Sequence, residues 1–293
     1  MMNTQIEYEN KTSDNVANGD VNLLNEDLVK ENWDECILKF DDLEIKSELL
    51  RGIYSYGYEL PSAIQQKAIK PLYSGRDLIA QAQSGTGKTA TFSIGVLERI
   101  EVNTDAIQAI IMAPTRELAE QIVHVVTDIG VFLGVKVHGC IGGAANPVQN
   151  DIRQLRKNNT HAVVGTPGRV LDLIRRRALI TSDIKVLVLD EADEMLSRGF
   201  EDQIRDVFKA LPDDVQAAVF SATYTLNSFD VAKRFMRNPV RILVKAQELT
   251  LKGIKQFFVA MDKESYKVET LFDIYAGITK GLYMYTNHTF GIL

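Results

Sequence analysis

Residues 82–89 carry the first chemistry that the sequence suggests, because their types and spacing suit phosphate binding. In order they are Ala82, Gln83, Ser84, Gly85, Thr86, Gly87, Lys88 and Thr89. Glycines let backbone N–H groups turn toward an anion, and a helix N-terminus adds a positive dipole end. The Lys88 ammonium can reach the outer phosphates of a nucleotide, and the Thr89 hydroxyl can ligate Mg²⁺. The segment therefore predicts a phosphate-binding loop, although Ala82 stands where the general pattern has glycine.

Two neighbouring carboxylates, Asp190 and Glu191, follow a short apolar run at residues 186–189. Alone, they could simply form the acidic first turn of a helix, where Asp and Glu are favoured. Beside a phosphate-binding loop they suit the chemistry of a Mg²⁺–nucleotide complex instead. Asp190 would then hold the metal, and Glu191 would orient or deprotonate the attacking water.

Several isolated side chains allow two interpretations. The Gln65 amide could read an adenine edge because it donates and accepts at once, and Phe40 could stack on the base. From spacing alone, a surface amide and a core aromatic are the simpler interpretations. Ser221 and Thr223 offer small hydroxyls at the end of an apolar run, which also suits an ordinary turn.

Two arginines and a glycine pair could contact a nucleic-acid backbone. Arg116 and Arg169 could bind phosphates, and Gly142-Gly143 would allow close backbone approach. Each of these residues could equally be solvated or cap a helix. The basic run 175–177 is most simply a solvated helix end.

Apolar runs alternate with helical patterns, and these elements must position the polar side chains. The expected strands are 78–82, 109–113, 135–141, 162–164, 186–189, 217–220 and 241–244. This alternation predicts an α/β fold with a parallel sheet of about seven strands flanked by helices. One helix is expected over 43–57, and another should begin at Pro61. Because ligands bind at the carboxyl ends of parallel strands, the scattered polar motifs should converge.

Composition limits the kind of protein. The chain has 293 residues, is 45% hydrophobic and 25% charged, and carries a net charge of −6, as expected for a globular protein. Its apolar runs are too short to span a membrane, the first residues lack a signal-peptide pattern, and two cysteines do not suggest a disulfide framework. An intracellular setting is therefore the default. Residues 1–35 are rich in Asn, Asp and Glu, and they predict a disordered, solvated tail.

These motifs give residues 40–278 a resemblance to the DEAD-box ATP-dependent RNA helicases, most closely to members that act in translation initiation. The matching segments are Phe40 with 57–65, 82–89, 114–119, Gly142-Gly143, 166–169, 190–193 and 221–223. Alanine is usual in this family at the position of Ala82, which explains that departure. The resemblance implies a RecA-like domain over residues 36–245 that uses ATP and Mg²⁺ as cofactors.

The resemblance also implies roles for individual residues. It implies that Phe40, Tyr58 and Gln65 contact adenine and that residues 82–89 contact the phosphates. Hydrolysis and its coupling to RNA opening fall to Lys88, Asp190, Glu191, Ser221 and Thr223, with Thr89 and Asp190 as metal ligands. The residues that the resemblance implies contact RNA are Pro114, Thr115, Arg116, Gly143, Thr166, Gly168 and Arg169. RNA would bind through its backbone without sequence preference.

Partners and location follow from the same resemblance. RNA and a translation-initiation scaffold protein are the expected partners, in the cytoplasm, and neither DNA nor a membrane is expected. The alternative within the family is a nuclear paralogue that acts in exon-junction complexes or ribosome assembly.

The sequence departs from the family pattern beyond residue 245. Residues 246–293 match a linker and only the opening of a second RecA-like domain, with a strand over 254–261 and a helix over 267–278. The arginines that complete the ATP site from that domain do not occur, and such an arginine contributes roughly 10³–10⁵-fold to phosphoryl transfer. Tyr224-Thr225 also replaces the usual Met-Pro. We therefore expect a C-terminally truncated helicase with weak ATP binding and little hydrolysis, or else a non-catalytic RNA- or protein-binding fragment.

Overall fold

A computed structural model describes residues 31–143, 146–157, 159–223, 235–243, 264–268 and 270–272. The chain divides into two compact units, Met1–Leu249 and Thr250–Leu293. In the second unit, the 3₁₀ helix η5, Glu264–Tyr266, is followed by helical residues at 267–268 and 270–272. The expected linker and strand over 246–261 lie outside the described residues, as does Tyr224-Thr225.

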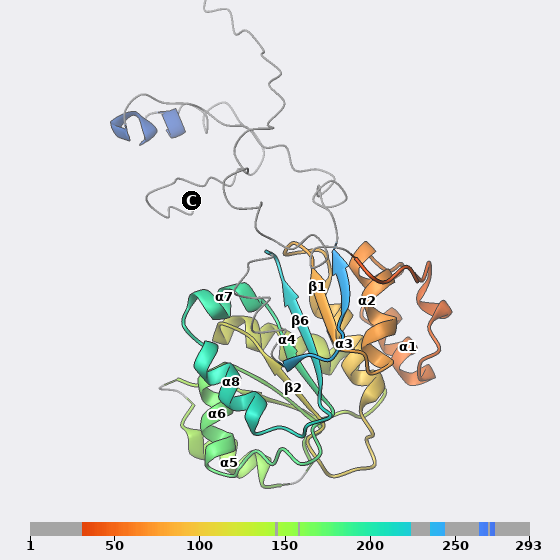
Figure 1. The fold of residues 1–293 in the computed structure, drawn as a ribbon, viewed down its shortest axis with the longest axis vertical. Helices are drawn as coiled ribbons and strands as arrows, with labels where there is room; N and C mark the ends of the chain where they lie inside the picture. The colour runs from red at the N-terminus through yellow and green to blue at the C-terminus, as the bar shows by residue number, and fades with distance from the viewer. Residues whose placement is uncertain are drawn as a thin grey trace, which may run out of the picture. The chain divides into compact units, whose positions relative to one another are not determined.

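The first unit is built on a seven-stranded sheet in which all neighbouring strands run parallel (Figure 1). The strands are β1 (Leu78–Gln81), β2 (Ala109–Met112), β3 (Val137–Cys140), β4 (Ala162–Gly165), β5 (Val186–Leu189), β6 (Gln216–Ser221) and β7 (Val240–Leu243). Their order is β3-β4-β2-β5-β6-β1-β7. The seven predicted strands are thus confirmed, with boundaries within two residues of those expected.

Helices precede the first strand and connect most of the later ones. They are α1 (Ser47–Ser55), α2 (Ala63–Tyr73), α3 (Lys88–Arg99), α4 (Arg116–Ile129), α5 (Val148–Leu155), α6 (Pro167–Arg175), α7 (Ala192–Ser197) and α8 (Glu201–Lys209), with the 3₁₀ helix η3 at Phe40–Asp42. No helix in the part of the chain that the structure describes is long and apolar enough to cross a membrane. Most strands are buried on both faces, so helices must cover the sheet on each side.

The helices divide between the two faces of the sheet. Alternate strand residues point to opposite faces, so Ile111 of β2 joins one apolar layer while its neighbour Ile110 joins the other. Helices α1 to α4 contribute to the layer of Ile111, and α5 to α8 contribute to the layer of Ile110. The ends of the strands lie between these two layers and are therefore held rigidly. A binding site at the carboxyl ends of the strands requires this rigidity.

Two expectations near the N-terminus need correction. The second helix begins at Ala63 rather than Pro61, because Ser62 is its N-cap and the Ser62 N–H donates to Gln65 Oε1 at 2.8 Å. Part of the expected tail contacts the fold: the Arg241 N–H of β7 donates to Asn32 Oδ1 at 2.6 Å and Trp33 packs against the core, while residues 31, 32, 34 and 35 are exposed. Residues 1–30 lie outside the described part of the chain.

Candidate functional site

The predicted phosphate-binding loop connects the carboxyl end of β1 to the first turn of α3. Gly87 is the N-cap of α3 and has a φ of +100°, a conformation that other residues rarely adopt. A methyl group at this position would also lie 2.6 Å from Gln65 Nε2. Lys88 opens the helix with a buried side chain. The loop thus places an ammonium group at a helix N-terminus, which favours anion binding.

The predicted adenine residues lie close to this loop. Gln65 Nε2 donates to Gly87 O at 3.4 Å, and Gln65 Oε1 accepts from Ser62 N at 2.8 Å. Gln65 is only 3% exposed, so its interpretation as a surface amide is wrong. Phe40 is fully buried and packs against Tyr54 and Tyr58, which confirms the core-aromatic interpretation. Adenine contacts by Phe40, Tyr58 and Gln65 stay predictions.

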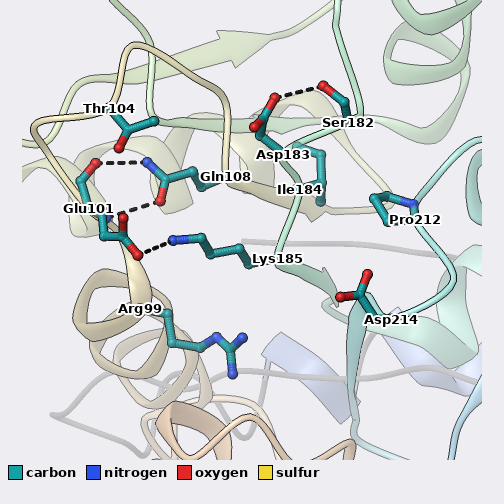
Figure 2. Close-up of a pocket in the computed structure, with 10 residues that line it drawn as sticks. All are labelled: Arg99, Glu101, Thr104, Gln108, Ser182, Asp183, Ile184, Lys185, Pro212 and Asp214. Atoms are coloured by element: carbon teal, nitrogen blue, oxygen red, sulfur yellow. Dashed lines mark hydrogen bonds and ion pairs between the residues drawn. The ribbon is translucent and has the colours of Figure 1, made fainter.

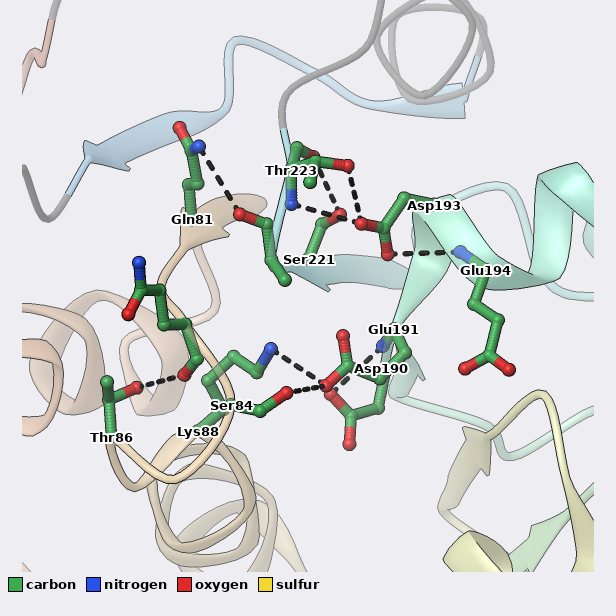
Figure 3. Close-up of polar contacts among 12 residues, drawn as sticks. Gln81, Ser84, Thr86, Lys88, Asp190, Glu191, Asp193, Glu194, Ser221 and Thr223 are labelled. Atoms are coloured by element: carbon green, nitrogen blue, oxygen red, sulfur yellow. Dashed lines mark hydrogen bonds and ion pairs between the residues drawn. The ribbon is translucent and has the colours of Figure 1, made fainter. Parts of the chain in front are cut away.

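Three predicted site residues meet at one carboxylate oxygen (Figure 3). Lys88 Nζ lies 2.9 Å from Glu191 Oε1, and Ser84 Oγ donates to the same oxygen at 3.1 Å. Glu191 is the N-cap of α7 and has a φ of +49°, in the left-handed region. The turn after β5 therefore brings a carboxylate onto the loop after β1, although Lys88 and Glu191 are 103 residues apart.

Asp190 is the first residue after β5 and is buried. Burial, followed by the adjacent Glu191 carboxylate, raises the pKa of Asp190 to about 7, while Lys88 acts in the opposite direction. A divalent cation beside this carboxyl group would offset both causes.

The donor atoms present fit Mg²⁺. Thr89 and Asp190 offer hydroxyl and carboxylate oxygens, the ligand type that Mg²⁺ prefers. Among the described residues, no cluster of three His, Cys, Asp or Glu side chains could hold a metal ion by itself. A sparse oxygen set suits Mg²⁺, which is commonly bound by one or two carboxylates together with substrate phosphates. The metal roles of Thr89 and Asp190 stay predictions.

Asp193 joins the site, although the sequence analysis placed it in the matching segment 190–193 without giving it a role. Thr223 donates to Asp193 Oδ2 through both its backbone N, at 3.0 Å, and its Oγ1, at 2.6 Å. Ser221 Oγ donates to Thr223 O at 2.8 Å. Burial would raise the pKa of Asp193, but the hydrogen bonds, that of the Thr223 side chain foremost, outweigh it and lower the pKa. These bonds connect the segment after β6 to α7, and in the view of Figure 3 they lie above Asp190 and Glu191.

The predicted backbone-binding residues gather around the glycine pair after β3. Arg116 is the first residue of α4, and a methyl group on Gly143 would lie 3.1 Å from Arg116 Nη1. Arg169 lies in the first turn of α6, and a methyl group on Gly142 would lie 3.3 Å from Arg169 Nη2. The glycines thus let two guanidinium groups approach the same turn, each from a helix N-terminus.

The remaining predicted RNA residues flank these two helix starts. Thr115 is the N-cap of α4 and accepts from Leu118 N at 3.2 Å, and Thr166 is the N-cap of α6. Pro114 precedes the first cap and Gly168 lies within the first turn of α6. Their contacts with RNA stay predictions. By contrast, the end of α6 is solvated as expected, since Arg175 and Arg176 form exposed ion pairs with acidic residues of α8 and α6.

A hollow of about 380 Å³ lies at the amino-terminal ends of the strands, opposite the phosphate-binding loop (Figure 2). Gln108 and Lys185, which line it, directly precede β2 and β5. Lys185 Nζ pairs with Glu101 Oε1 at 2.6 Å, and Gln108 Nε2 donates to Glu101 O at 2.8 Å. No predicted site residue lines this hollow, so it is separate from the phosphate-binding loop.

Comparison with known sequences gives these features a family context. Residues 62–231 match the family model described as DEAD/DEAH box helicase. The chain is 56% identical over 254 residues to the ATP-dependent RNA helicase eIF4A of Pyricularia oryzae, covering 87% of this chain and 63% of that relative. It is 55% identical over 259 residues to the protein of the same name from Schizosaccharomyces pombe, covering 88% and 65%. The chain therefore spans less than two thirds of the length of these relatives.

Solved structures show the same architecture. S. cerevisiae Dbp5 bound to RNA and ADP BeF3 matches with a TM-score of 0.70 and 36% identity, over 82% of this chain and 60% of that one. A DEAD box protein from the hyperthermophile Methanococcus jannaschii matches with a TM-score of 0.69 and 32% identity, over 82% and 63%. These matches confirm the predicted RecA-like parallel sheet flanked by helices.

Proposed function

Because the chain belongs to the DEAD/DEAH box helicase family, we propose that it acts as an ATP-dependent RNA helicase of the translation-initiation type. One observation carries the nucleotide part of this proposal. Ser84 and Lys88 of the phosphate-binding loop both contact Glu191 Oε1, an anionic oxygen at the place where a phosphate oxygen would bind. The relatives named ATP-dependent RNA helicase eIF4A support the choice of ATP and RNA.

In this proposal the triphosphate enters the loop over residues 82–89 and competes with Glu191 for the Lys88 ammonium, since both are anions. The released Glu191 carboxylate can then orient the attacking water and accept its proton. Thr89 and Asp190 would hold Mg²⁺, which neutralises charge that develops on the phosphates. Thr223 is hydrogen-bonded to Asp193 next to this turn, and it would transmit the displacement of Glu191 to the segment after β6.

RNA would bind at the two helix starts around Gly142 and Gly143. Arg116 and Arg169 supply positive charge there, and helix N-termini supply backbone donors for phosphate oxygens. Contacts of this kind do not read bases, so binding should be independent of sequence and should weaken as salt rises.

A substitution in the phosphate-binding loop tests the nucleotide proposal. Lys88→Ala removes the buried ammonium and should weaken binding of a fluorescent ATP analogue by roughly tenfold or more, because a charge-assisted contact is lost. Lys209→Ala, an exposed lysine at the end of α8, is the matched control and should leave binding unchanged. Equal affinities of the Lys88→Ala variant and the unmodified chain would overturn the proposal.

A second candidate function is non-catalytic binding of RNA or of an initiation scaffold protein. It requires only the charged helix starts around Gly142 and Gly143, which lie within the described residues. RNA-stimulated ATP hydrolysis measured beside a pull-down with the scaffold separates the two, since binding without turnover supports the second. The cytoplasm is the proposed location, and imaging of the tagged protein in cells would distinguish it from a nuclear role in exon-junction complexes or ribosome assembly.

A further inference from the structure

Asp151 of α5 is the centre of a buried polar cluster that the proposed function leaves without a role. The residue is 1% exposed. Its Oδ1 lies 3.1 Å from His138 Nε2 of β3 and accepts from Asn146 Nδ2 at 3.4 Å. Its Oδ2 accepts from Arg169 Nη1 of α6. One carboxylate thus joins a strand, a loop and a second helix.

The cluster fixes the Arg169 guanidinium from two sides. Arg169 Nη2 donates to Asn146 O at 3.0 Å, while Nη1 donates to Asp151. Asn146 is itself tied to the glycine turn, because its Nδ2 donates to Ile141 O at 2.9 Å and its N donates to Gly143 O at 3.2 Å. A guanidinium has five N–H donors, so these two bonds leave three for another acceptor.

Asp151 carries a full negative charge in this position. Burial would raise the pKa of its carboxyl group, but the hydrogen bonds from His138 and Arg169 outweigh burial and hold the pKa below its usual value. A buried ionised acceptor makes shorter and stronger bonds than a neutral one. The orientation of Arg169 is therefore set by a rigid partner rather than by mobile solvent.

Resting on the proposed binding of RNA through its backbone, we propose that Asp151 is a positioning residue for an RNA phosphate. It holds Arg169 against Gly142, within the turn that Asn146 closes, so that the remaining donors of Arg169 stay fixed for a phosphate oxygen. Asp151 itself would not touch the RNA.

Charge and geometry give opposite expectations when Asp151 is neutralised. Asp151→Asn makes the face more positive by one charge, which alone would strengthen binding of a polyanion. It also removes the ionised acceptor that orients Arg169, which should weaken binding. A loss of RNA affinity in this variant therefore reports positioning, because the electrostatic effect acts in the other direction.

The test uses the full 293-residue chain and a fluorescein-labelled single-stranded RNA at low salt. We expect Asp151→Asn to weaken RNA binding roughly three- to tenfold, the net value of one ordinary hydrogen bond. The Arg169→Gln variant should lose a similar amount, and the double variant should lose no more than Arg169→Gln alone. Asp172→Asn is the matched control, since Asp172 carries the same charge on α6 but pairs with the exposed Arg176, and it should not weaken binding.

Each outcome decides the matter. Unchanged or tighter RNA binding by Asp151→Asn, weakening that adds to Arg169→Gln, or a parallel loss of ATP-analogue affinity would overturn the inference. If Asp151→Asn does not fold, Asp151→Glu displaces the carboxylate by one methylene group and should weaken RNA binding with ATP-analogue affinity kept; unchanged RNA affinity would count against it. Failure of the unmodified chain to bind RNA overturns the proposed function and this inference together, whereas the variant results concern Asp151 alone.

Discussion

Three carboxylates at the candidate site, of which Asp151 and Asp190 are buried and Asp193 is half-buried, illustrate how residue surroundings decide charge. Burial acts to raise the pKa of each of them. For Asp190 it prevails, aided by Glu191, and the pKa reaches about 7. For Asp151 and Asp193 it is outweighed by hydrogen bonds from Arg169, His138 and Thr223, so their pKa values fall. Asp190 is therefore the carboxylate that most needs a nearby cation, and the other two have their partners within the protein.

The low pKa of Asp151 predicts a particular dependence of stability on pH. Its folded pKa lies below the ordinary value of 3.8, so the ionised form stabilises the folded state above that value. This contribution is lost as pH falls through the folded pKa. Urea unfolding should show Asp151→Asn less stable by about 1–3 kcal/mol at pH 7, with the deficit shrinking below pH 4. A deficit that stayed constant down to pH 3 would contradict this account, and Asp172→Asn provides the exposed control.

At the scale of elements, the junction between β1 and α3 depends on Gly87 for two separate reasons. Its φ is +100°, and a methyl group there would meet Gln65 Nε2 at 2.6 Å. Gly199, between α7 and α8, has a φ of +79° but open space around a methyl group. Comparison of the two positions separates backbone strain from collision.

We expect Gly199→Ala to cost about 1–2 kcal/mol of unfolding free energy, the usual cost of a left-handed residue with a side chain. Gly87→Ala should cost more and should also weaken ATP-analogue binding, because Gln65 must move. Chemical unfolding and nucleotide titration of both variants check this. Equal losses of stability, with nucleotide binding intact in Gly87→Ala, would show that the contact with Gln65 is unimportant.

The elements also show where sequence patterns suffice. Runs such as 109–112 and 186–189 are continuously apolar, so the strands they form in a two-sided sheet could be predicted from type and length alone. The burial of Gln65 could not, because its partner Gly87 lies 22 residues later. Asp151 was missed for the same reason: its partners His138, Asn146 and Arg169 come from β3, a loop and α6, and only the folded sheet brings them to one carboxylate.

For the first unit as a whole, the two apolar layers share a single sheet. Ile110 and Ile111 are neighbours on β2, both fully buried, yet each belongs to a different layer. We expect Ile110→Ala and Ile111→Ala each to cost about 2–5 kcal/mol, as large-to-small core changes do. Because both layers pack on the same strands, each variant should shift one common unfolding transition. Separate transitions by fluorescence and circular dichroism would indicate that the layers unfold independently.

The position of β1 in the sheet has a consequence for synthesis of the chain on the ribosome. Leu78 pairs with Ala218 of β6 on one side and with Val240 of β7 on the other. The two strands that flank the strand leading into the phosphate-binding loop are therefore synthesised about 140 and 160 residues later. At roughly 5–20 residues per second, this delay lasts on the order of 10–30 s. A nascent chain held short of β7 would lack one of the two strands that flank β1.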